Sequence, residues 1–455
     1  MSELTYIEVL IERARKAQKE FEHFSQKQVD DIVRAMGKVI YDNAEMIAQE
    51  AVEETGYGRV DSKIVKLRRC TLAAWHYMHD KKSVGMIDYD PVEKLATFAK
   101  PVGIVAALVP TTNPVSTAAS NGMSILKCRN AMIVSPHPRA KKVTIHGVEL
   151  MNAELAKLGA PEHLIQVIDQ PSMAATQELM EKVDVVVATG GAAMVKSAYS
   201  SGRPSYGVGP GNVQVIVAPD YQDFDKLATN VINSRSYDNG MPCTGEQAIH
   251  LPRNVVAEIL SAFVSKGAYV LPDEAAAKLS GFLFKENGMI DPQYVGMLPH
   301  KLAALLGLKI PEDTKLLLFK SQGMTRENLL RREKLCPVVQ YFPYDTFEEG
   351  VANAKSNLEW EGAGHSSVVY TNNEVNAEYV GAELPVSRLV VNQPGGSASG
   401  GNFTNGLHPT MSLGCGSWGN NSISDNLTYK HLMNTTKLAY YHEPTIPAPE
   451  VVWAE

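Results

Sequence analysis

The spacing of apolar residues predicts that the chain begins with two amphipathic helices. In the first, five apolar residues recur at helical intervals and share one face: Ile7, Leu10, Ile11, Ala14 and Ala17. The second is expected to start at Ser25, because Ser25 and Gln28 have the spacing of a capping box. Its inner face would carry Val29, Ile32, Val33, Met36, Val39 and Ile40. The charged outer faces indicate scaffold helices with one side in solvent.

From residue 94 the pattern changes to strands. Residues 94–101 alternate as a hairpin-like strand does, and residues 103–109 form an apolar run, as expected of a strand buried on both faces. Further strands are expected at residues 131–134, 164–168, 184–188 and 213–217. Helices are expected over residues 116–127 and 140–158, after Ser172 and after Gly191. This alternation predicts a parallel, doubly wound sheet.

Ligands bind at the carboxyl ends of the strands in such sheets. Three loops occupy these positions here: Pro110-Thr-Thr-Asn-Pro114, Ser135-Pro-His-Pro-Arg139 and Thr189-Gly-Gly191. The last of them joins a strand to an alanine-rich helix, an arrangement that accommodates a pyrophosphate. It is not a G-x-G-x-x-G fingerprint, and a plain crossover turn explains it equally well.

A second α/β block is expected to follow, from about residue 227 to residue 392. Beyond it, the glycine-rich residues 395–401 and the segment Leu413-Gly-Cys-Gly-Ser-Trp-Gly419 predict loops that approach other groups closely. The tail from Asn434 has the pattern of an edge strand, which would pair either with a neighbouring subunit or within the chain.

Composition narrows the class of protein. A chain of 455 residues predicts two or three domains, and a net charge of -7 without long charged runs argues against nucleic acid as a partner. Five cysteines without C-x-x-C spacing argue against a disulfide framework and favour a reducing compartment. His137, His146 and His365 lack the spacing of metal ligands, so no metal is expected. The sequence shows neither a signal peptide nor a membrane-spanning run, and a cytoplasmic protein that does not bind membranes is expected.

One cysteine has the surroundings of a nucleophile. Cys243 follows an Asn-Gly turn and precedes a polar run from Thr244 that is expected to begin a helix. A thiol at a helix N-terminus favours the thiolate form, which attacks carbonyls. Asn113, at the end of a buried strand, offers the amide N–H that an oxyanion hole needs. The structural alternatives are a small buried hydrophobe at Cys243 and a simple turn at Asn113.

Taken together, these motifs resemble the CoA-acylating branch of the aldehyde dehydrogenase superfamily over nearly the whole chain. The matching segments are Pro110-Thr-Thr-Asn-Pro114, Ser135-Pro-His-Pro-Arg139, Ala188-Thr-Gly-Gly191, Tyr237-Asp-Asn-Gly240 with Cys243 and Glu246-Gln247, and Leu413-Gly-Cys-Gly-Ser-Trp-Gly419. The resemblance implies two doubly wound Rossmann-type α/β domains plus a small oligomerisation arm, in a homodimer or homotetramer. The cofactor-binding domain would comprise residues 1–90 and 103–230, the catalytic domain residues 231–427, and the arm residues 91–102 and 428–455.

The resemblance also implies roles for individual residues. Cys243 would be the nucleophile, and its backbone N–H would form the oxyanion hole with Asn113. His365 would assist proton transfer from the thiol, although a hydrogen-bonded loop residue is an equal alternative. Glu333, in a Glu-x-x-x-Pro pattern that ends at Pro337, would bind the nicotinamide ribose of NAD or NADP. Other residues expected at the cofactor are Thr111, Thr112, Ser135, His137, Pro138, Arg139, Thr189, Gly190, Gly191 and Gly209.

Two departures from the wider superfamily are informative. Hydrolytic members carry a Glu-Leu-Gly-Gly segment whose glutamate activates water, whereas Gly207-Val-Gly-Pro-Gly-Asn212 has no carboxylate. The acyl-cysteine is therefore expected to wait for the thiol of CoA. The lysine that usually holds the adenosine ribose is also missing. Arg139, Lys141 and Lys142 lie near its place and would hold a phosphate of NADP or of CoA, or form a solvated helix start.

The expected reaction is the reversible conversion of an aldehyde, CoA and NAD(P)+ to acyl-CoA and NAD(P)H. Among members of the branch, those acting on the anionic aldehydes succinate semialdehyde and sulfoacetaldehyde are favoured, and Arg235 is a candidate cation for such a substrate. Acetaldehyde and propionaldehyde are the alternatives. Two different classes also stay open: a thiol-redox sensor based on Cys243, and a nucleotide-binding scaffold without chemistry.

Overall fold

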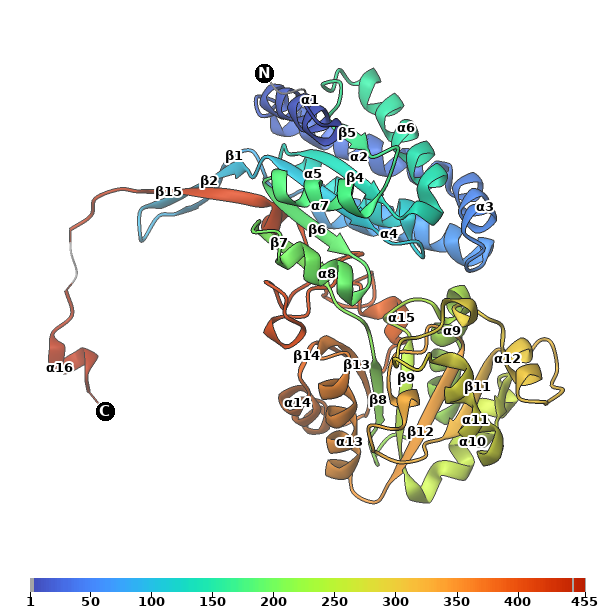
Figure 1. The fold of residues 1–455 in the computed structure, drawn as a ribbon. Coiled ribbons are helices and arrows are strands. Elements are labelled where there is room, and N and C mark those ends of the chain that lie inside the picture. Colours follow the sequence, from blue (N-terminus) through green and yellow to red (C-terminus); the bar gives the residue numbers. More distant parts are fainter. Residues whose placement is uncertain (1–3, 444–445, 455) are drawn as a thin grey trace.

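The computed structural model describes residues 4–443 and 446–454, which form two α/β domains and a projecting arm (Figure 1). The first domain contains a five-stranded parallel sheet in the order β5-β4-β3-β6-β7. Its strands are Ile104–Val109 (β3), Ala131–Pro136 (β4), Ile165–Val167 (β5), Val185–Thr189 (β6) and Ser205–Val208 (β7). The strand order reverses between β3 and β6, so a ligand crevice is expected at the carboxyl ends of these two strands.

Helices cover both faces of this sheet. They are Tyr6–Phe21 (α1), Gln26–Asp42 (α2), Ala44–Thr55 (α3), Val60–Met78 (α4), Pro114–Lys127 (α5), Lys141–Lys157 (α6), Met173–Lys182 (α7) and Ala192–Tyr199 (α8), with a 3-10 turn at Pro138–Ala140 (η1). The predicted capping box at Ser25 is present, and the six apolar residues predicted for the inner face of α2 are all buried. These two predictions are confirmed.

The second domain contains a seven-stranded parallel sheet in the order β10-β11-β12-β9-β8-β13-β14. Its strands are Val213–Val217 (β8), Glu246–Pro252 (β9), Ala268–Val270 (β10), Leu316–Lys320 (β11), Val338–Tyr344 (β12), Gly364–Tyr370 (β13) and Val386–Val391 (β14). Its helices are Phe224–Ser236 (α9), Val256–Ser265 (α10), Asp273–Leu283 (α11), Pro299–Leu305 (α12), Phe347–Trp360 (α13), Glu374–Glu383 (α14) and Gly395–Ala398 (α15). Shorter 3-10 turns are Tyr237–Gly240 (η2), Arg253–Val255 (η3), Pro292–Tyr294 (η4), Leu329–Arg331 (η5), Ser417–Gly419 (η6) and Tyr429–Leu432 (η7).

The strand at residues 213–217 corrects the expected topology. The sequence placed it at the end of the first sheet, but β8 pairs with β9 and β13 in the second sheet. The last strand of the first sheet is β7, which is short and contains a serine and a glycine. A continuous apolar run indicates burial on both faces without specifying a partner strand, so the pattern did not distinguish the two sheets. The chain therefore crosses between the domains over residues 209–212.

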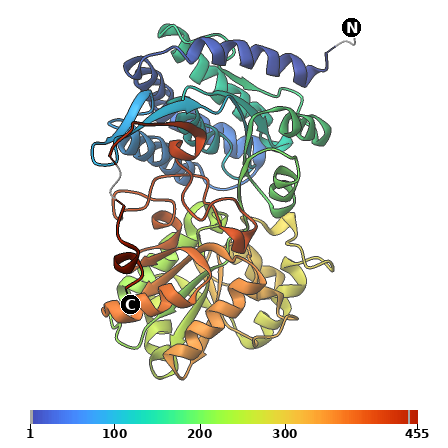
Figure 2. The ribbon, with the colours of Figure 1, turned by 90° about the vertical axis from the view of Figure 1, so that its left-hand side faces the viewer.

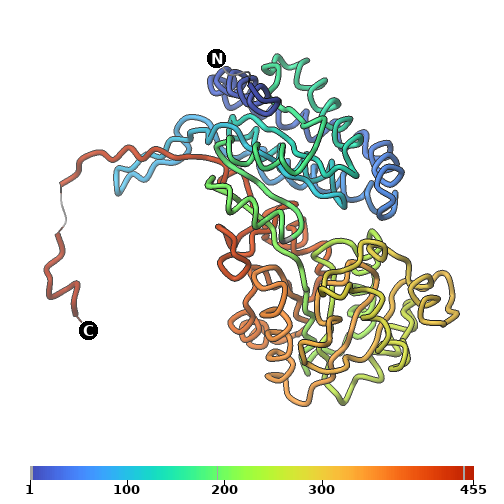
Figure 3. The backbone as a smooth tube through the Cα atoms, viewed as in Figure 1, coloured from blue at the N-terminus to red at the C-terminus, as the bar shows by residue number. Residues whose placement is uncertain are grey.

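The arm is a three-stranded antiparallel sheet of Gly85–Asp90 (β1), Leu95–Pro101 (β2) and Met433–Ala439 (β15). The tail strand β15 pairs with β2 of its own chain, which resolves the alternative left open by the sequence. β1, which the sequence assigned to the cofactor-binding domain, belongs to this sheet. Figure 2 shows the arm on one side of the first domain, and Figure 3 shows the C-terminal segment, with Pro449–Val452 (α16), extending away from the body.

Within residues 4–443 and 446–454, no helix has both the length and the apolar character needed to span a bilayer.

Candidate active site

Cys243 lies in a turn between η2 and strand β9. The helix predicted to begin at Thr244 is absent, because the segment from Glu246 is a central strand whose residues are all buried. Its polar side chains Glu246, Gln247 and His250 resemble an exposed helix start, but they lie between β8 and β12. The thiol therefore has no helix dipole behind it.

The residues before β8 pack directly against Cys243. β8 and β9 are adjacent parallel strands, so the segments that precede them lie side by side at one edge of the sheet. A side-chain carbon added to Gly211 would lie 1.9 Å from the backbone oxygen of Cys243, which shows how closely the two segments approach. The segment 207–212, in which the sequence shows no carboxylate, thus lies beside Cys243.

The acidity of Cys243 differs from the expectation. Burial, with smaller contributions from the neighbouring acidic groups Glu333 and Cys415, raises the pKa of the thiol to about 12. In the absence of ligands Cys243 is therefore protonated at neutral pH. The sequence predicted a stabilised thiolate, and this prediction is wrong for the ligand-free site because it relied on a helix that does not form.

A cavity of about 560 Å³ extends from Cys243 between the two domains. The first domain contributes the loops after β3, β4 and β6. The strand order reverses between β3 and β6, and β4 is the neighbour of β3. The cavity brings together most of the residues that the sequence proposed for catalysis and cofactor binding: Thr111, Thr112, Asn113, Ser135, His137, Pro138, Arg139, Thr189, Gly190, Gly191, Gly209, Cys243 and Glu333.

Three proposed residues do not line this cavity. Pro337 is buried, and His365 lies on β13 with its Nδ1 2.8 Å from Ser366 Oγ. Burial lowers the pKa of His365 to about 3, so the ring is neutral near pH 7. Arg235 is fully buried and donates to Gln247 Oε1 at 3.1 Å, so it is not available to a substrate anion.

Glu333 and Arg139 are the acidic and basic side chains of the large cavity. The Glu333 carboxylate accepts a hydrogen bond of 3.2 Å from the backbone N–H of Gly211, and burial beside Glu361 raises its pKa to about 8. Arg139 donates to the Tyr57 hydroxyl at 2.9 Å and to the Thr55 carbonyl at 3.0 Å. It stacks over the Tyr57 ring, and Lys141 and Lys142 do not line this cavity.

A smaller cavity of about 90 Å³ adjoins Cys243 as well. Both spaces share four lining residues: Asn113, Thr189, Val208 and Cys243. Cys243 therefore lies where the two cavities meet. The smaller cavity is also lined by two cations of helix α4, Lys66 and Arg69.

The sequence analysis did not identify Lys66 or Arg69 as candidate site residues, and it also missed Lys63 on the same helix. Lys63 and Lys66 are buried, at 4% and 5% exposure, on the same face of α4 as the buried Leu67. The sequence does contain a signal for them, because basic residues recur at helical intervals on a face that is otherwise mostly apolar. A buried charge of this kind is retained only where it has a partner. Lys66 has one in Asp238 of η2, at 2.7 Å. Arg69 makes no hydrogen bond or ion pair with any residue that the structure describes.

Comparisons with known proteins agree with this geometry. The model of the aldehyde dehydrogenase family matches residues 2–273. The succinate-semialdehyde dehydrogenase (acetylating) of Clostridium kluyveri is 50% identical over 455 residues, which is 100% of both chains. The sulfoacetaldehyde dehydrogenase of an Acholeplasma species is 39% identical over 98% of this chain and 93% of its own length.

Solved structures show the same architecture. The acetylating aldehyde dehydrogenase of Geobacillus thermoglucosidasius superposes with a TM-score of 0.93, at 36% identity and over 97% of each chain. The propionaldehyde dehydrogenase of Rhodopseudomonas palustris, solved with bound propionyl-CoA, has a TM-score of 0.84 at 26% identity, over 95% of this chain and 94% of its own. With its cysteine between two cavities, this chain belongs to the aldehyde dehydrogenase family, in the CoA-acylating branch whose enzymes use NAD(P) and coenzyme A.

Proposed function

We propose that the physiological substrate is a small anionic aldehyde, such as succinate semialdehyde or sulfoacetaldehyde, which the enzyme converts reversibly to its acyl-CoA. The observation that carries this proposal is Arg69, a cation without a protein partner among the described residues, in the small cavity beside Cys243. A guanidinium in this position suits a carboxylate or sulfonate, since it presents several N–H donors to either anion. The volume of about 90 Å³ matches a substrate of few atoms.

Cys243 acts as the nucleophile that attacks the aldehyde carbon in this proposal. Asn113 lines both cavities beside the sulfur, and its side-chain amide donates to the oxygen on which negative charge develops. The thiol proton must leave during this step, because the pKa of the resting thiol is about 12. The product of oxidation is a thioester on Cys243.

The large cavity suits a nicotinamide cofactor. Its volume of about 560 Å³ lies within the range of about 300–1,000 Å³ of small-molecule sites. Gly190 and Gly191 leave backbone facing the cavity, and a side-chain carbon on Gly191 would meet no atom within 4 Å. Glu333 would hold the nicotinamide ribose, and Arg139 would lie near a phosphate. When bound, NAD(P)+ supplies the hydride acceptor and a positive charge near the thiol.

Transfer to CoA follows from the residues beside Cys243. Residues 207–212 lie against the backbone of Cys243 and contain no carboxylate that could activate water, so the thioester persists until a thiol attacks it. Acetaldehyde and propionaldehyde are the alternative substrates, and they would leave Arg69 without a charge partner.

Location and assembly form part of the same proposal. A cytoplasmic location is supported by five cysteines that are all free thiols, as a reducing compartment keeps them. A homodimer or homotetramer is supported by the arm, whose strands β1 and β15 each have one edge without a partner strand among the described residues.

The proposal is tested with a panel of succinate semialdehyde, sulfoacetaldehyde, propionaldehyde and acetaldehyde, each with CoA and either NAD+ or NADP+. The anionic aldehydes should give the higher kcat/KM, and Cys243→Ala should bind cofactor without forming an acyl adduct. A preference for the neutral aldehydes would overturn the substrate assignment. Oxidation of Cys243 by peroxide without any CoA-dependent reduction of NAD(P)+ would instead indicate a redox sensor.

A further inference from the structure

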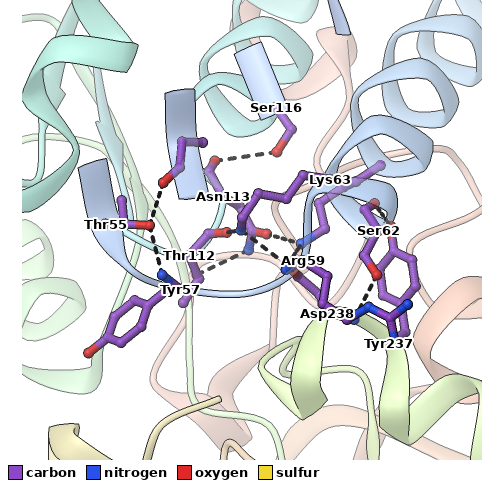
Figure 4. Close-up of polar contacts among 12 residues, drawn as sticks. Thr55, Tyr57, Arg59, Ser62, Lys63, Thr112, Asn113, Ser116, Tyr237 and Asp238 are labelled. Atoms are coloured by element: carbon purple, nitrogen blue, oxygen red, sulfur yellow. Dashed lines mark hydrogen bonds and ion pairs between the residues drawn. The ribbon is translucent and has the colours of Figure 1, made fainter. Parts of the chain in front are cut away.

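Two lysines of helix α4 hold the carbonyl groups of the loop that carries Asn113. Lys63 Nζ donates to the backbone oxygen of Thr112 at 3.0 Å, and Lys66 Nζ donates to the side-chain oxygen of Asn113. Figure 4 shows Lys63 reaching toward Thr112 and Asn113 from the adjacent helix. Both the main chain and the side chain at the oxyanion site are thus held by buried cations.

The carboxylate that balances the positive charges of these lysines comes from the other domain. Asp238, fully buried in η2, lies 2.7 Å from Lys66 Nζ and 3.3 Å from Lys63 Nζ, and it accepts the backbone N–H of Arg59 at 2.9 Å. Its backbone is in the left-handed region, with φ of 48°. A non-glycine residue adopts this conformation at a cost that its surroundings must offset. η2 ends three residues before Cys243, so the same contacts fix the approach to the nucleophile.

The bond from Lys66 determines which end of the Asn113 amide faces the reacting carbonyl. The oxygen and nitrogen ends of an asparagine amide have nearly the same shape, so packing alone does not select between them. A lysine ammonium has donors only, and it therefore requires the oxygen end. The Nδ2 end donates one N–H to Thr112 Oγ1 at 3.2 Å, which leaves the second N–H for another acceptor.

We infer that Lys66 and Asp238 form a positioning pair that holds the Asn113 amide with its N–H toward the substrate oxygen and ties this loop to the Cys243 loop across the domain boundary. Neither residue reacts. Lys66 sets the orientation of the amide, and Asp238 gives the buried Lys66 ammonium a carboxylate partner and joins the two domains where Asn113 and Cys243 meet. The inference rests on the proposed role of Asn113 as the oxyanion donor.

The test is a double-mutant cycle between Lys66→Met and Asn113→Ala, assayed with propionaldehyde and succinate semialdehyde. Loss of an oxyanion donor costs about 10²–10³-fold in kcat, so a misplaced amide in Lys66→Met should lower kcat at least about 10-fold with either aldehyde. In the Asn113→Ala background, Lys66→Met should cost less than about 3-fold more, because the two residues act through one amide. Arg68→Met is the matched control, since Arg68 pairs with Glu45 on the outer side of the same helix.

The neutral aldehyde distinguishes positioning from substrate binding, because Lys66 also lines the small cavity. A rise in KM confined to succinate semialdehyde, with kcat unchanged, would overturn the inference, and so would an equal loss of kcat in both backgrounds. Lys66→Gln, which keeps a polar partner for Asp238, is carried through the same cycle in case the methionine variant folds poorly. Inactivity of the wild-type chain with every aldehyde would instead refute the proposed function.

Discussion

At the scale of single residues, the resting state of Cys243 is the main departure from expectation. Its motif predicts a nucleophile, but the acidity of the thiol depends first on burial and then on Glu333 and Cys415, which are 90 and 172 residues away in the sequence. Local sequence predicts which residue reacts, whereas the burial and the groups around the sulfur are known only once the chain has folded. The protonated thiol has a measurable consequence.

Alkylation of Cys243 by iodoacetamide should accelerate about tenfold per pH unit from pH 7 to pH 10 without reaching a plateau. A thiol with a pKa of about 12 supplies a thiolate fraction that keeps rising over this range. NAD(P)+ should increase the rate at pH 8, since a nearby positive charge lowers the pKa of a thiol. The rate is followed by mass spectrometry, with Cys243→Ala as the control. A plateau below pH 9 in the free enzyme would contradict this prediction.

Arg69 should determine the preference for anionic aldehydes. Arg69→Gln is expected to raise the KM for succinate semialdehyde about 10- to 100-fold, since a hydrogen bond to a charged group contributes about 1.5–3 kcal/mol. The KM for propionaldehyde should change much less. Arg68→Gln, on the neighbouring outward position of the same helix, serves as the control. An equal change for both aldehydes would assign Arg69 a structural role.

At the scale of elements, the contact between the segments before β8 and β9 leaves no room for a side chain at Gly211. Gly211→Ala should lower both activity and stability, because the added carbon would overlap the backbone oxygen of Cys243. The expected cost in the free energy of unfolding is about 1–3 kcal/mol, as for other overpacked positions.

The matched control is Gly281→Ala in helix α11, where an added carbon meets no atom within 4 Å. Because alanine stabilises a helix relative to glycine, this variant should gain about 0.5–1 kcal/mol. Urea denaturation and kcat report both effects. Unaltered activity in Gly211→Ala would show that the Cys243 loop adjusts freely.

Element types were predictable where a pattern had a single interpretation. The capping box of α2 and the buried run of β3 satisfied this condition. β9 did not, because Glu246, Gln247 and His250 are polar residues in the middle of a buried sheet, where burial against neighbouring strands overrides their preference for solvent. β8 was recognised as a strand, but strand pairing over long distances is not encoded in local periodicity.

At the scale of the whole molecule, the arm and the domain boundary show which features follow from the sequence and which depend on distant segments coming together. The resemblance implied an arm, and the structure contains one, but its first strand β1 came from a segment assigned to another domain. Motifs on strand ends named most of the candidate residues that line the large cavity. The Lys66–Asp238 pair was not, because it depends on a helix and a turn of different domains coming into contact.

Removal of β15 should abolish assembly. A chain that ends at Leu432 leaves β2 without its partner strand and the arm as a two-stranded hairpin, which has little stability alone. Sedimentation equilibrium should report a monomer for this variant and a dimer or tetramer for the full chain. An unchanged mass would place the subunit interface elsewhere.

The meeting of the two cavities at Cys243 has a consequence for regulation in the cell. The smaller space, at about 90 Å³, is too small for a coenzyme, so we expect both NAD(P)H and CoA to approach Cys243 through the larger one. The second half of the reaction then begins only when the first product has departed. Turnover should consequently respond to the ratio of CoA to reduced cofactor, with NAD(P)H competing against CoA, and a cell rich in reducing equivalents would slow its own aldehyde oxidation without a separate regulatory site.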